Sequence, residues 1–533
     1  MATSNASSKY NYISCKKLIK DGSPAVWQLK PKKNEIGNLT KMTLGEKNPN
    51  KKNKTILLVG ETGTGKSTLI NTLVNYTIGV KWEDDVWFQI VEDEKKEQFE
   101  SQTSDVIVYE IFGFEGSVLP FSLTIIDTPG FGDTKGLEMD EAINKRLFDL
   151  FCSEDGVHEI DAVGLVLKAG LNRLSDRLSY IFNSVVSLFG KDLERNIVAL
   201  ITHSPGGTPT NALKALEAAN IKCARNEKGQ PVHFLFNNSQ NDTREDDTDD
   251  LEYSYTKAMK GMHQFTAFLK KTAPQNLEKT MSVHKEQIRL EACIHNLKDR
   301  IESIPHKLKE IQQIQEGLMK NEQEMKNNKE FTVEYDEHYK DKESVYSRTW
   351  GWGMFFEGAV SCTVCEETCH FPGCTTAKKP YWCEVMKGNY CTVCTGKCIY
   401  EHHVKENWRY VNKTRRVKKN LQSVKDKYEK NRTETEKKMG ILEIFQKQNE
   451  TLEANKTHWL NGAYECFIKL EQIALNVVSV STYDHLKFLI GELEKKKEGE
   501  KVKKLKEMSL KKAEGFLAGL QYSKTIKGKN QKV

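Results

Sequence analysis

Residues 56–68 read ILLVGETGTGKST, and this stretch decides the fold class that we expect. The apolar run Ile56–Val59 predicts a buried β-strand, and the residues from Thr68 onward predict a helix. Between them, residues 60–67 fit the phosphate-binding pattern G-x-x-x-x-G-K-[ST] in full. Because the pattern stands between a strand and a helix, as phosphate-binding loops do, the sequence predicts an α/β domain that binds phosphate groups.

The residue types in this loop suit separate tasks. Glycines let successive backbone N–H groups face the phosphates of a nucleotide. Lys66 is expected to reach the β- and γ-phosphates as a catalytic residue, and the Ser67 hydroxyl is expected to bind Mg²⁺. We expect the whole loop to contact the nucleotide: Gly60, Glu61, Thr62, Gly63, Thr64, Gly65, Lys66, Ser67 and Thr68.

A second motif, D-T-P-G at residues 127–130, follows another apolar run. An acid at the end of a strand suits a Mg²⁺ site, usually through water, so Asp127 is predicted to bind the ion. Gly130 allows a backbone N–H to approach the γ-phosphate. Thr103, before the apolar run 106–112, is the candidate for closing over Mg²⁺ and the γ-phosphate. The predicted Mg²⁺ ligands are therefore Ser67, Thr103 and Asp127, and the predicted catalytic residues are Lys66, Thr103 and Gly130.

Short apolar runs alternate with helical stretches over residues 54–272. This alternation is typical of an α/β domain with a mostly parallel sheet and helices on both faces. Residues 1–53 are polar and end in a basic run, so we expect them to form a polar leader outside the domain.

These motifs resemble the septin-like branch of the P-loop GTPases, which includes septins, the immunity-associated (GIMAP) proteins and the chloroplast import GTPases. Residues 60–71 and 127–133 are similar to septin sequences at the same motifs. Residues 171–175, before a predicted helix that ends at Phe189-Gly190, are similar to a stretch of the immunity-associated proteins. The resemblance covers about residues 55–270. It implies a GTP-binding switch whose hydrolysis depends on Mg²⁺ and whose chemistry can need self-association.

The resemblance is incomplete where the family recognises guanine. The family motif is [NT]-K-x-D, but the matching residues 202–205 are T-H-S-P and lack the carboxylate. The resemblance implies that Thr202, His203, Asn237 and Asn238 contact the base. Phe131 stands where Ras-type enzymes carry the glutamine that orients water, so we expect slow hydrolysis. A nucleotide-binding scaffold without turnover and an ATPase or unspecific NTPase stay open as alternatives.

From about residue 273 the pattern becomes helical. Residues 273–349 and 404–458 predict an outgoing and a returning stalk helix, which form an antiparallel coiled-coil hairpin with residues 350–403 at its tip. Residues 459–520 predict a further helical region, and residues 521–533 a disordered tail. The first seam of the heptad pattern holds Val283, Leu290, Leu297, Ile304, Ile311, Leu318 and Met325.

The insert over residues 350–403 holds eight cysteines, and C-x2-C occurs twice in it. Two thiolates at this spacing can bind one tetrahedral Zn²⁺, so we expect two closed, structural zinc sites. A disulfide knot, a redox-sensing thiol cluster and iron–sulfur ligation are the alternatives. The pairing of ligands stays open, and a protein partner at the zinc-bearing tip is possible. The predicted ligands are Cys362, Cys365, Cys369, His370, Cys374, Cys383, Cys391, Cys394, Cys398 and His402.

Composition limits the remaining function classes. The 533 residues include 80 Lys and Arg against 74 Asp and Glu, so the net charge of +6 argues against a strongly basic nucleic-acid binder. A nucleic-acid-sensing ATPase is the weaker rival. Apolar runs are far shorter than the roughly 18 residues of a membrane span. We expect a cytoplasmic protein without a transmembrane segment, which self-associates through its α/β domain or its helices.

Overall fold

A computed structural model describes most of the chain. It divides into two units: the first holds Met1–His284, Glu471–Tyr483 and Lys506–Val533, and the second holds Lys285–Leu470 and Asp484–Leu505. The residues described are 9–36, 39–92, 105–129, 137–172, 176–239, 242–244, 248–320, 332–345, 349–350, 355–356, 358–371, 377, 379–420, 423, 441–477 and 480–510.

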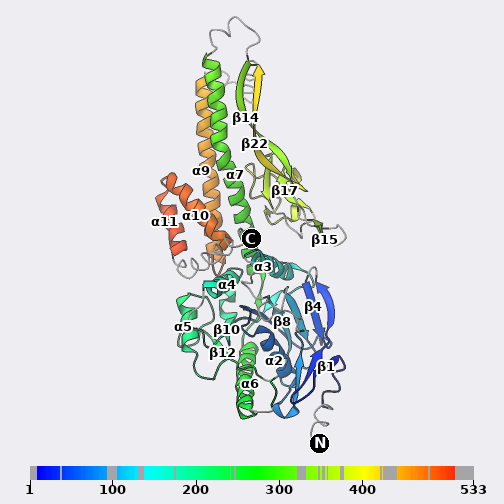
Figure 1. The fold of residues 1–533 in the computed structure, drawn as a ribbon. Coiled ribbons are helices and arrows are strands. Elements are labelled where there is room, and N and C mark those ends of the chain that lie inside the picture. The colour runs from blue at the N-terminus through cyan, green and yellow to red at the C-terminus, as the bar shows by residue number, and fades with distance from the viewer. Residues whose placement is uncertain are drawn as a thin grey trace, which may run out of the picture. The chain divides into compact units, whose positions relative to one another are not determined.

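An eight-stranded sheet forms the centre of the first unit (Figure 1). The five strands at one side are mutually parallel, β7 is antiparallel to β8, and the outermost pair β4 and β3 is antiparallel. The prediction of a mostly parallel sheet is therefore confirmed. In order across the sheet, the strands are β12 (His233–Leu235), β11 (Ile197–Thr202), β10 (Ala162–Lys168), β5 (Asn53–Gly60), β8 (Ser122–Asp127), β7 (Ile107–Ile111), β4 (Leu39–Leu44) and β3 (Lys32–Ile36).

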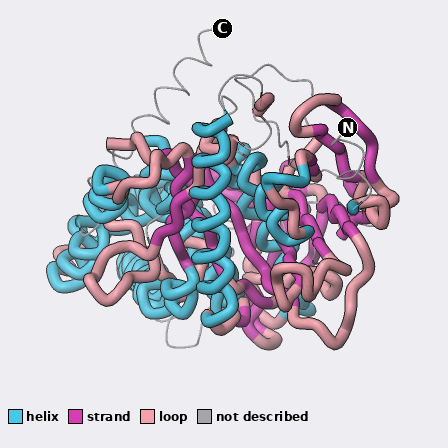
Figure 2. Tube along the Cα trace, turned by 90° about the horizontal axis from the view of Figure 1, so that it is seen from below, coloured by secondary structure: helices cyan, strands magenta, loops and turns pink. Residues whose placement is uncertain are grey.

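Helices cover both faces of this sheet, and Figure 2 shows the strands running between them. Alternate residues of β5 point to opposite faces, as in any strand. Leu57 belongs to one buried cluster with Ile181 of α4, whereas Leu58 belongs to a second cluster with Leu73 of α2 and Phe265 of α6. Both faces of the central strand are therefore apolar, which explains its continuous apolar run. The helices are α2 (Lys66–Ile78), α3 (Leu137–Cys152), α4 (Asp176–Val186), α5 (Thr210–Ala218) and α6 (Thr248–Lys271).

The N-terminal segment differs from its prediction. Residues 9–36 and 39–53 are not a polar leader, because they carry four strands. Strands β1 (Lys16–Lys20) and β2 (Ala25–Leu29) form a small sheet with β6 (Val86–Gln89), while β3 and β4 extend the main sheet. Strands β2 and β4 bury only two large apolar side chains each, such as Leu29 and Leu44, and Leu18 and Ile19 of β1 are exposed. Because the apolar residues are so sparse, the segment is polar on average, and its composition does not indicate strands.

Two helices of the second unit run antiparallel. Helix α7 (Glu278–Lys320) crosses from the first unit into the second, and α9 (Ile441–Ile473) returns beside it (Figure 1). Glu286 pairs with Lys469 near one end, and Arg300 stacks on Trp459 further along. Predicted seam residues such as Leu290 and Leu297 are buried. The helical region continues with α10 (Val480–Lys495) and α11 (Gly499–Leu510), and the predicted tail over residues 521–533 lies outside the described residues.

A long β-hairpin replaces parts of both predicted stalk helices. Strands β14 (Thr332–Ser344) and β22 (Trp408–Asn420) pair antiparallel along their whole length, so the helix predictions over 273–349 and 404–458 are wrong there. The second unit is accordingly not all-α. Burial alternates along β14, with Val333 and Tyr335 inward, and charged pairs such as Glu337 with Arg415 hold the strands together. Because both strands are rich in Lys, Arg and Glu, their composition is also that of a solvated helix.

The cysteine-rich residues form a compact module that connects β14 to β22 and lies beside α7, not at the tip of a helical hairpin. We call residues 358–406 the cysteine module. Its main sheet orders β18 (Glu367–His370), β17 (Ala359–Cys362) and β21 (His403–Glu406). Ala292 of α7 packs in its core, and the Asn296 amide donates a hydrogen bond to the Thr368 carbonyl. The β-hairpin turns the chain back along α7, which the sequence pattern did not indicate.

Across the described residues, none of the helices combines the length and the apolar character that crossing a bilayer requires.

Candidate functional site

The phosphate-binding loop lies where β5 ends and α2 begins. Gly63 and Gly65 have φ values of 77° and 87°, in the left-handed region that favours glycine. A Cβ atom on Gly60 would lie 2.6 Å from the Val166 carbonyl oxygen, so only glycine fits there. The loop backbone therefore adopts its curve because the glycines of the motif permit it.

Lys66 is buried at the first position of α2, with 8% of its surface exposed. Its ammonium group donates hydrogen bonds to the carbonyls of Gly60 at 2.8 Å and Glu61 at 3.3 Å. Burial lowers the pKa of Lys66 to about 8, and the negative charges of Asp127 and Glu61 partly oppose this shift. The loop thus holds a buried ammonium group whose pKa lies only about one unit above neutral pH.

Asp127 ends strand β8 and is fully buried. It pairs in register with Leu58 of β5, and its charge acts on Lys66. The Thr128 hydroxyl donates to the Leu58 carbonyl at 2.8 Å and fixes the chain just after the strand. The structure therefore brings Lys66 and Asp127 together, next to half-buried Ser67. Thr103 and Gly130, the other predicted residues, lie outside the described part of the chain.

The predicted base-contacting segments follow β11 and β12. The Thr202 hydroxyl donates to the Thr64 carbonyl at 2.7 Å, which joins the end of β11 to the phosphate loop. His203 has a φ of 52°, and partial desolvation of its mostly exposed ring, together with the positive charge of Lys168, lowers its pKa. The Asn237 amide donates to the Ser254 hydroxyl at 2.9 Å.

Asn238 differs from its neighbour. Both polar atoms of its side-chain amide are buried, and neither has a hydrogen-bond partner among the described residues. A buried amide without partners is costly unless a ligand completes its bonds. Asn238 is therefore the side chain in these two segments that is best prepared to bind a polar base edge.

With the loop, the buried acid and the strand order known, the chain can be compared with other proteins. Residues 54–252 match the model of the AIG1 family. The match includes the phosphate loop, Asp127, Thr202 and Asn238. Together with the phosphate loop and the strand order, it identifies this part of the chain as a P-loop GTPase-type domain.

Solved structures also overlap with part of the chain. Toc33 from Arabidopsis thaliana in complex with Mg²⁺ and GMPPNP is 16% identical, with a TM-score of 0.28 over 42% of this chain and 88% of that chain. Toc33 with GDP and Mg²⁺ gives 16% identity and a TM-score of 0.29 over the same shares. Translation elongation factor SelB from Methanococcus maripaludis gives 12% and 0.23, over 42% of this chain and 35% of that chain. Among curated proteins, none matches this chain.

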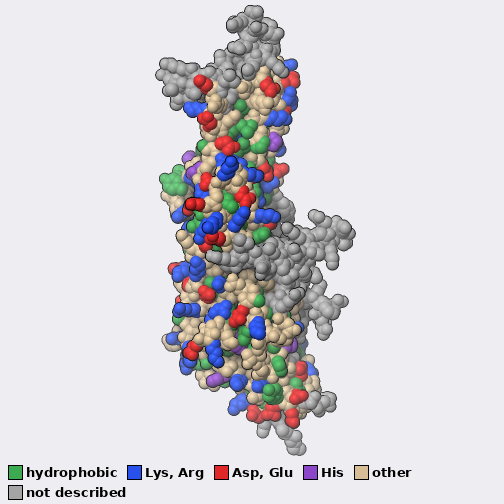
Figure 3. Space-filling view, turned by 90° about the vertical axis from the view of Figure 1, so that its left-hand side faces the viewer, with side chains coloured by type: hydrophobic (Ala, Val, Ile, Leu, Met, Phe, Trp, Pro, Cys, Tyr) green, Lys and Arg blue, Asp and Glu red, His purple; other side chains and the backbone are tan. Residues whose placement is uncertain are grey.

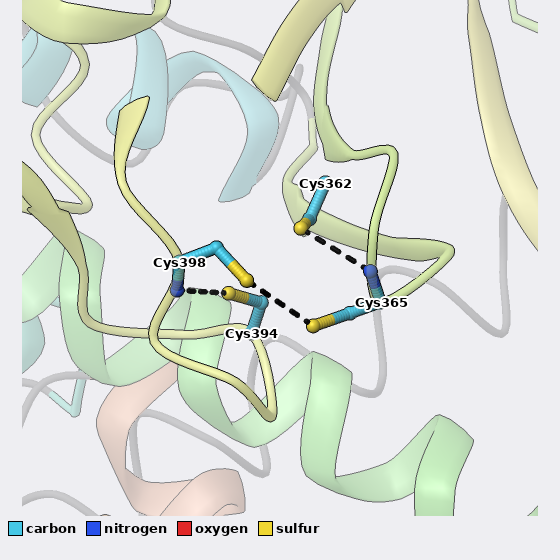
Figure 4. Close-up of side chains that lie close together, drawn as sticks. All are labelled: Cys362, Cys365, Cys394 and Cys398. Carbon is cyan, nitrogen blue, oxygen red and sulfur yellow. Dashed lines mark hydrogen bonds between the residues drawn. The ribbon is translucent and has the colours of Figure 1, made fainter. Parts of the chain in front are cut away.

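The second candidate site lies in the cysteine module. Figure 4 shows the sulfur atoms of Cys362, Cys365, Cys394 and Cys398 turned toward one another. The sulfurs of Cys365 and Cys398 are 3.7 Å apart. All described cysteines are free thiols, which does not support the disulfide alternative within this part of the chain.

Three sets of possible metal ligands occur in the described residues of the module, and each set lies within 4.8 Å. His402 belongs to none of them because its side chain is exposed, whereas the neighbouring His403 is buried in one set. The sets therefore do not support His402 as a ligand, and its role stays a prediction. Cys374 lies outside the described residues. The sets are Cys362, Cys365, Cys394 and Cys398; Cys369, Cys391, Cys394 and His403; and His370, Cys383 and Glu384.

Two cysteines outside the cysteine module contact each other. Cys293 of α7 and Cys466 of α9 share a hydrogen bond between their thiols, which lowers the pKa of Cys293 to about 7. They are 173 positions apart in the sequence, and no spacing rule connects them. Only the antiparallel pairing of the two helices brings the thiols together.

Proposed function

We propose that the α/β domain is a Mg²⁺-dependent guanine-nucleotide-binding switch that hydrolyses GTP slowly. The observation that carries the proposal is the buried Lys66 within a complete phosphate loop, under the influence of the Asp127 carboxylate. In this role Lys66 neutralises the β- and γ-phosphates, while Ser67 and Asp127 hold Mg²⁺. Thr103 and Gly130 would close over the γ-phosphate, and the AIG1 family match supports the assignment.

The preference for guanine is a separate part of the proposal. The Asn238 amide can both donate to and accept from a base edge, and Thr202 and Asn237 are held beside their strands by hydrogen bonds. Pro205 stands where the family carries the carboxylate that accepts two bonds from guanine. If Asn238 does not compensate for that loss, the domain is an ATPase or an unspecific NTPase.

The remaining parts of the proposal concern the second unit. Its helix pair α7–α9 would transmit the nucleotide state to self-association or to a protein partner, and the cysteine module would hold two structural zinc ions. A cytoplasmic location belongs to the proposal because thiolate ligands need a reducing compartment. On the face in Figure 3, Lys and Arg side chains are interspersed with Asp and Glu over the described residues, which favours no nucleic-acid partner.

Mass spectrometry of nucleotide released from freshly purified protein tests the first part, together with competitive GTP and ATP binding in Mg²⁺. Bound GDP or GTP, and a guanine preference of roughly a hundredfold, would support the proposal. Adenine nucleotide, or no preference, would exclude the guanine assignment. Lys66→Ala is the control that should lose nucleotide in either case.

Multiple-turnover phosphate release separates the switch from a scaffold that binds without turnover. Release above that of the Lys66→Ala variant supports slow hydrolysis. Tight binding with release equal to that variant supports the scaffold instead.

A further inference from the structure

Seven side chains of the cysteine module gather into two sets of four, and Cys394 belongs to both. The first set has four sulfur donors, and the second has three sulfurs and the His403 imidazole. Two tetrahedral zinc ions need eight coordination positions. Seven donors supply eight positions if one thiolate binds both ions. The remaining six donors are Cys362, Cys365 and Cys398 of the first set, and Cys369, Cys391 and His403 of the second.

We propose that the module holds a binuclear zinc centre in which the Cys394 thiolate bridges the two ions. The inference rests on the zinc binding proposed above and adds the pairing of ligands and the shared sulfur. One ion takes four sulfurs, and the other takes three sulfurs and one nitrogen.

The histidine is prepared for this role by its own hydrogen bond. His403 is 5% exposed, and its Nδ1 lies 2.9 Å from the Ile399 carbonyl oxygen. A carbonyl only accepts, so Nδ1 carries the proton and the lone pair is on Nε2. A hydrogen bond of this kind orients metal-binding histidines in general. Nε2 is also buried, so it can face an ion without competition from water.

The backbone stabilises negative sulfur at the same positions. The N–H groups of Cys365 and Cys394 donate to the sulfurs of Cys362 and Cys391 at 3.4 Å, the same arrangement in both C-x2-C segments. The Cys398 N–H donates to the Cys394 sulfur at 3.2 Å. Six thiolates around two Zn²⁺ ions leave a net charge of 2−, which such donors help to offset. Sharing Cys394 avoids a seventh thiolate and a larger buried charge.

The apolar core of the module is small. Five of the eleven residues in the buried core are cysteines, and the others are mostly small or aliphatic, among them Val360, Val385 and Val393. A segment of this size with so few apolar residues does not fold on hydrophobic burial alone. Metal coordination supplies the missing free energy in small domains of this kind.

Cadmium NMR of the full chain tests the bridge. Zinc is replaced by ¹¹³Cd, and the one-dimensional ¹¹³Cd spectrum is recorded. We expect two resonances from the two sets, with the four-sulfur ion further downfield, each split by coupling to the other ion through the shared sulfur. The third donor set contributes one sulfur only, and Cys383→Ser identifies any signal from it.

Matched variants assign the ligands. Cys398→Ser should alter the four-sulfur resonance alone, whereas Cys394→Ser should alter both resonances and abolish the splitting. His403→Ala should displace the second resonance, and His402→Ala should leave the spectrum unchanged because that ring is exposed.

Two results would overturn the inference in distinguishable ways. Two bound ions without splitting, or a single ion in these two sets, would exclude the shared thiolate while zinc binding stands. A chain without metal in either set would exclude the zinc proposal as well. If Cys394→Ser fails to fold, the splitting in the unmodified chain and the Zn–Zn distance from X-ray absorption decide the question.

Discussion

The phosphate loop and the cysteine module obtain their geometry in different ways. The loop joins a buried strand to a buried helix, and its curve follows from glycine conformations and from packing on both sides of the sheet. The module has short strands, a small core in which five of eleven residues are cysteines, and side chains that converge from distant positions. The geometry of the phosphate loop is therefore set by the backbone. The geometry of the cysteine module is set by the side chains that converge in it. Each should respond to a different perturbation.

Removing zinc should have the largest effect, and it should act on the module alone. Structural zinc contributes about 10–16 kcal/mol in zinc-finger peptides, more than a small apolar core can replace. Hydrogen exchange measured by mass spectrometry should show loss of protection over the cysteine module after a zinc-selective chelator is added. Strands β5 and β8 should stay protected because Mg²⁺ and the sheet are untouched. Retained protection in a module shown to be metal-free would contradict the comparison.

Breaking the contact between the module and α7 should have the next largest effect. Arg300 and Glu367 form an ion pair at 2.6 Å with side chains about 10% exposed, and Arg300 also donates to the Val393 carbonyl. Arg300→Met leaves a buried carboxylate without its cation, which should cost about 3 kcal/mol in the urea-unfolding free energy of the second unit.

Lys413→Ala is the matched control for this ion pair. Lys413 and Asp341 are 2.7 Å apart, nearly the same distance, but both side chains are more than 40% exposed. Surface pairs of this kind contribute little, so the unfolding transition should not move measurably. Equal losses in both variants would mean that burial does not govern these pairs.

The same comparison explains how much could be predicted from sequence. The loop and the strands around it were predictable because a local motif and continuous apolar runs specify them. The C-x2-C spacing indicated that cysteines converge in the module, and their binding of metal stays a prediction. The choice of His403 over His402 was not predictable, because adjacent residues of one segment differ only in the side to which they point.

Pairing between residues far apart in sequence explains the two larger errors of prediction, the stalk helices and the polar leader. Strands β14 and β22 are rich in charged residues. Each adopts the strand conformation because it pairs with the other, as between Glu337 and Arg415. The strands before residue 53 are likewise stabilised by the sheet they join. In each case the deciding contact joins residues far apart in sequence, which local periodicity does not record.

The pH dependence of binding tests whether the loop behaves as a buried cation site. Lys66 has a pKa of about 8 without nucleotide, and contact with phosphate favours its protonated form. Above pH 8 the protein must therefore take up a proton to bind. The dissociation constant of a fluorescent GTP analogue should rise as pH increases, by up to about tenfold per unit above pH 8.

Lys66→Met supplies the control for that measurement. The variant binds more weakly at every pH but lacks the titrating group, so its remaining pH dependence reports only the nucleotide's own titration. Identical slopes in the two proteins between pH 7 and 9.5 would mean that Lys66 keeps its proton throughout.

The smallest effect concerns the proposed contact between the Asn238 side chain and the base. Asn238→Ala removes an amide whose two polar atoms are buried without partners among the described residues. If those atoms bind guanine, GTP affinity should fall about tenfold, which corresponds to one or two hydrogen bonds, while ATP affinity stays the same. Ser254→Ala, which only releases the neighbouring Asn237, should have a weaker effect. Equal losses for GTP and ATP in competition titrations would mean that Asn238 supports the loop and does not recognise the base.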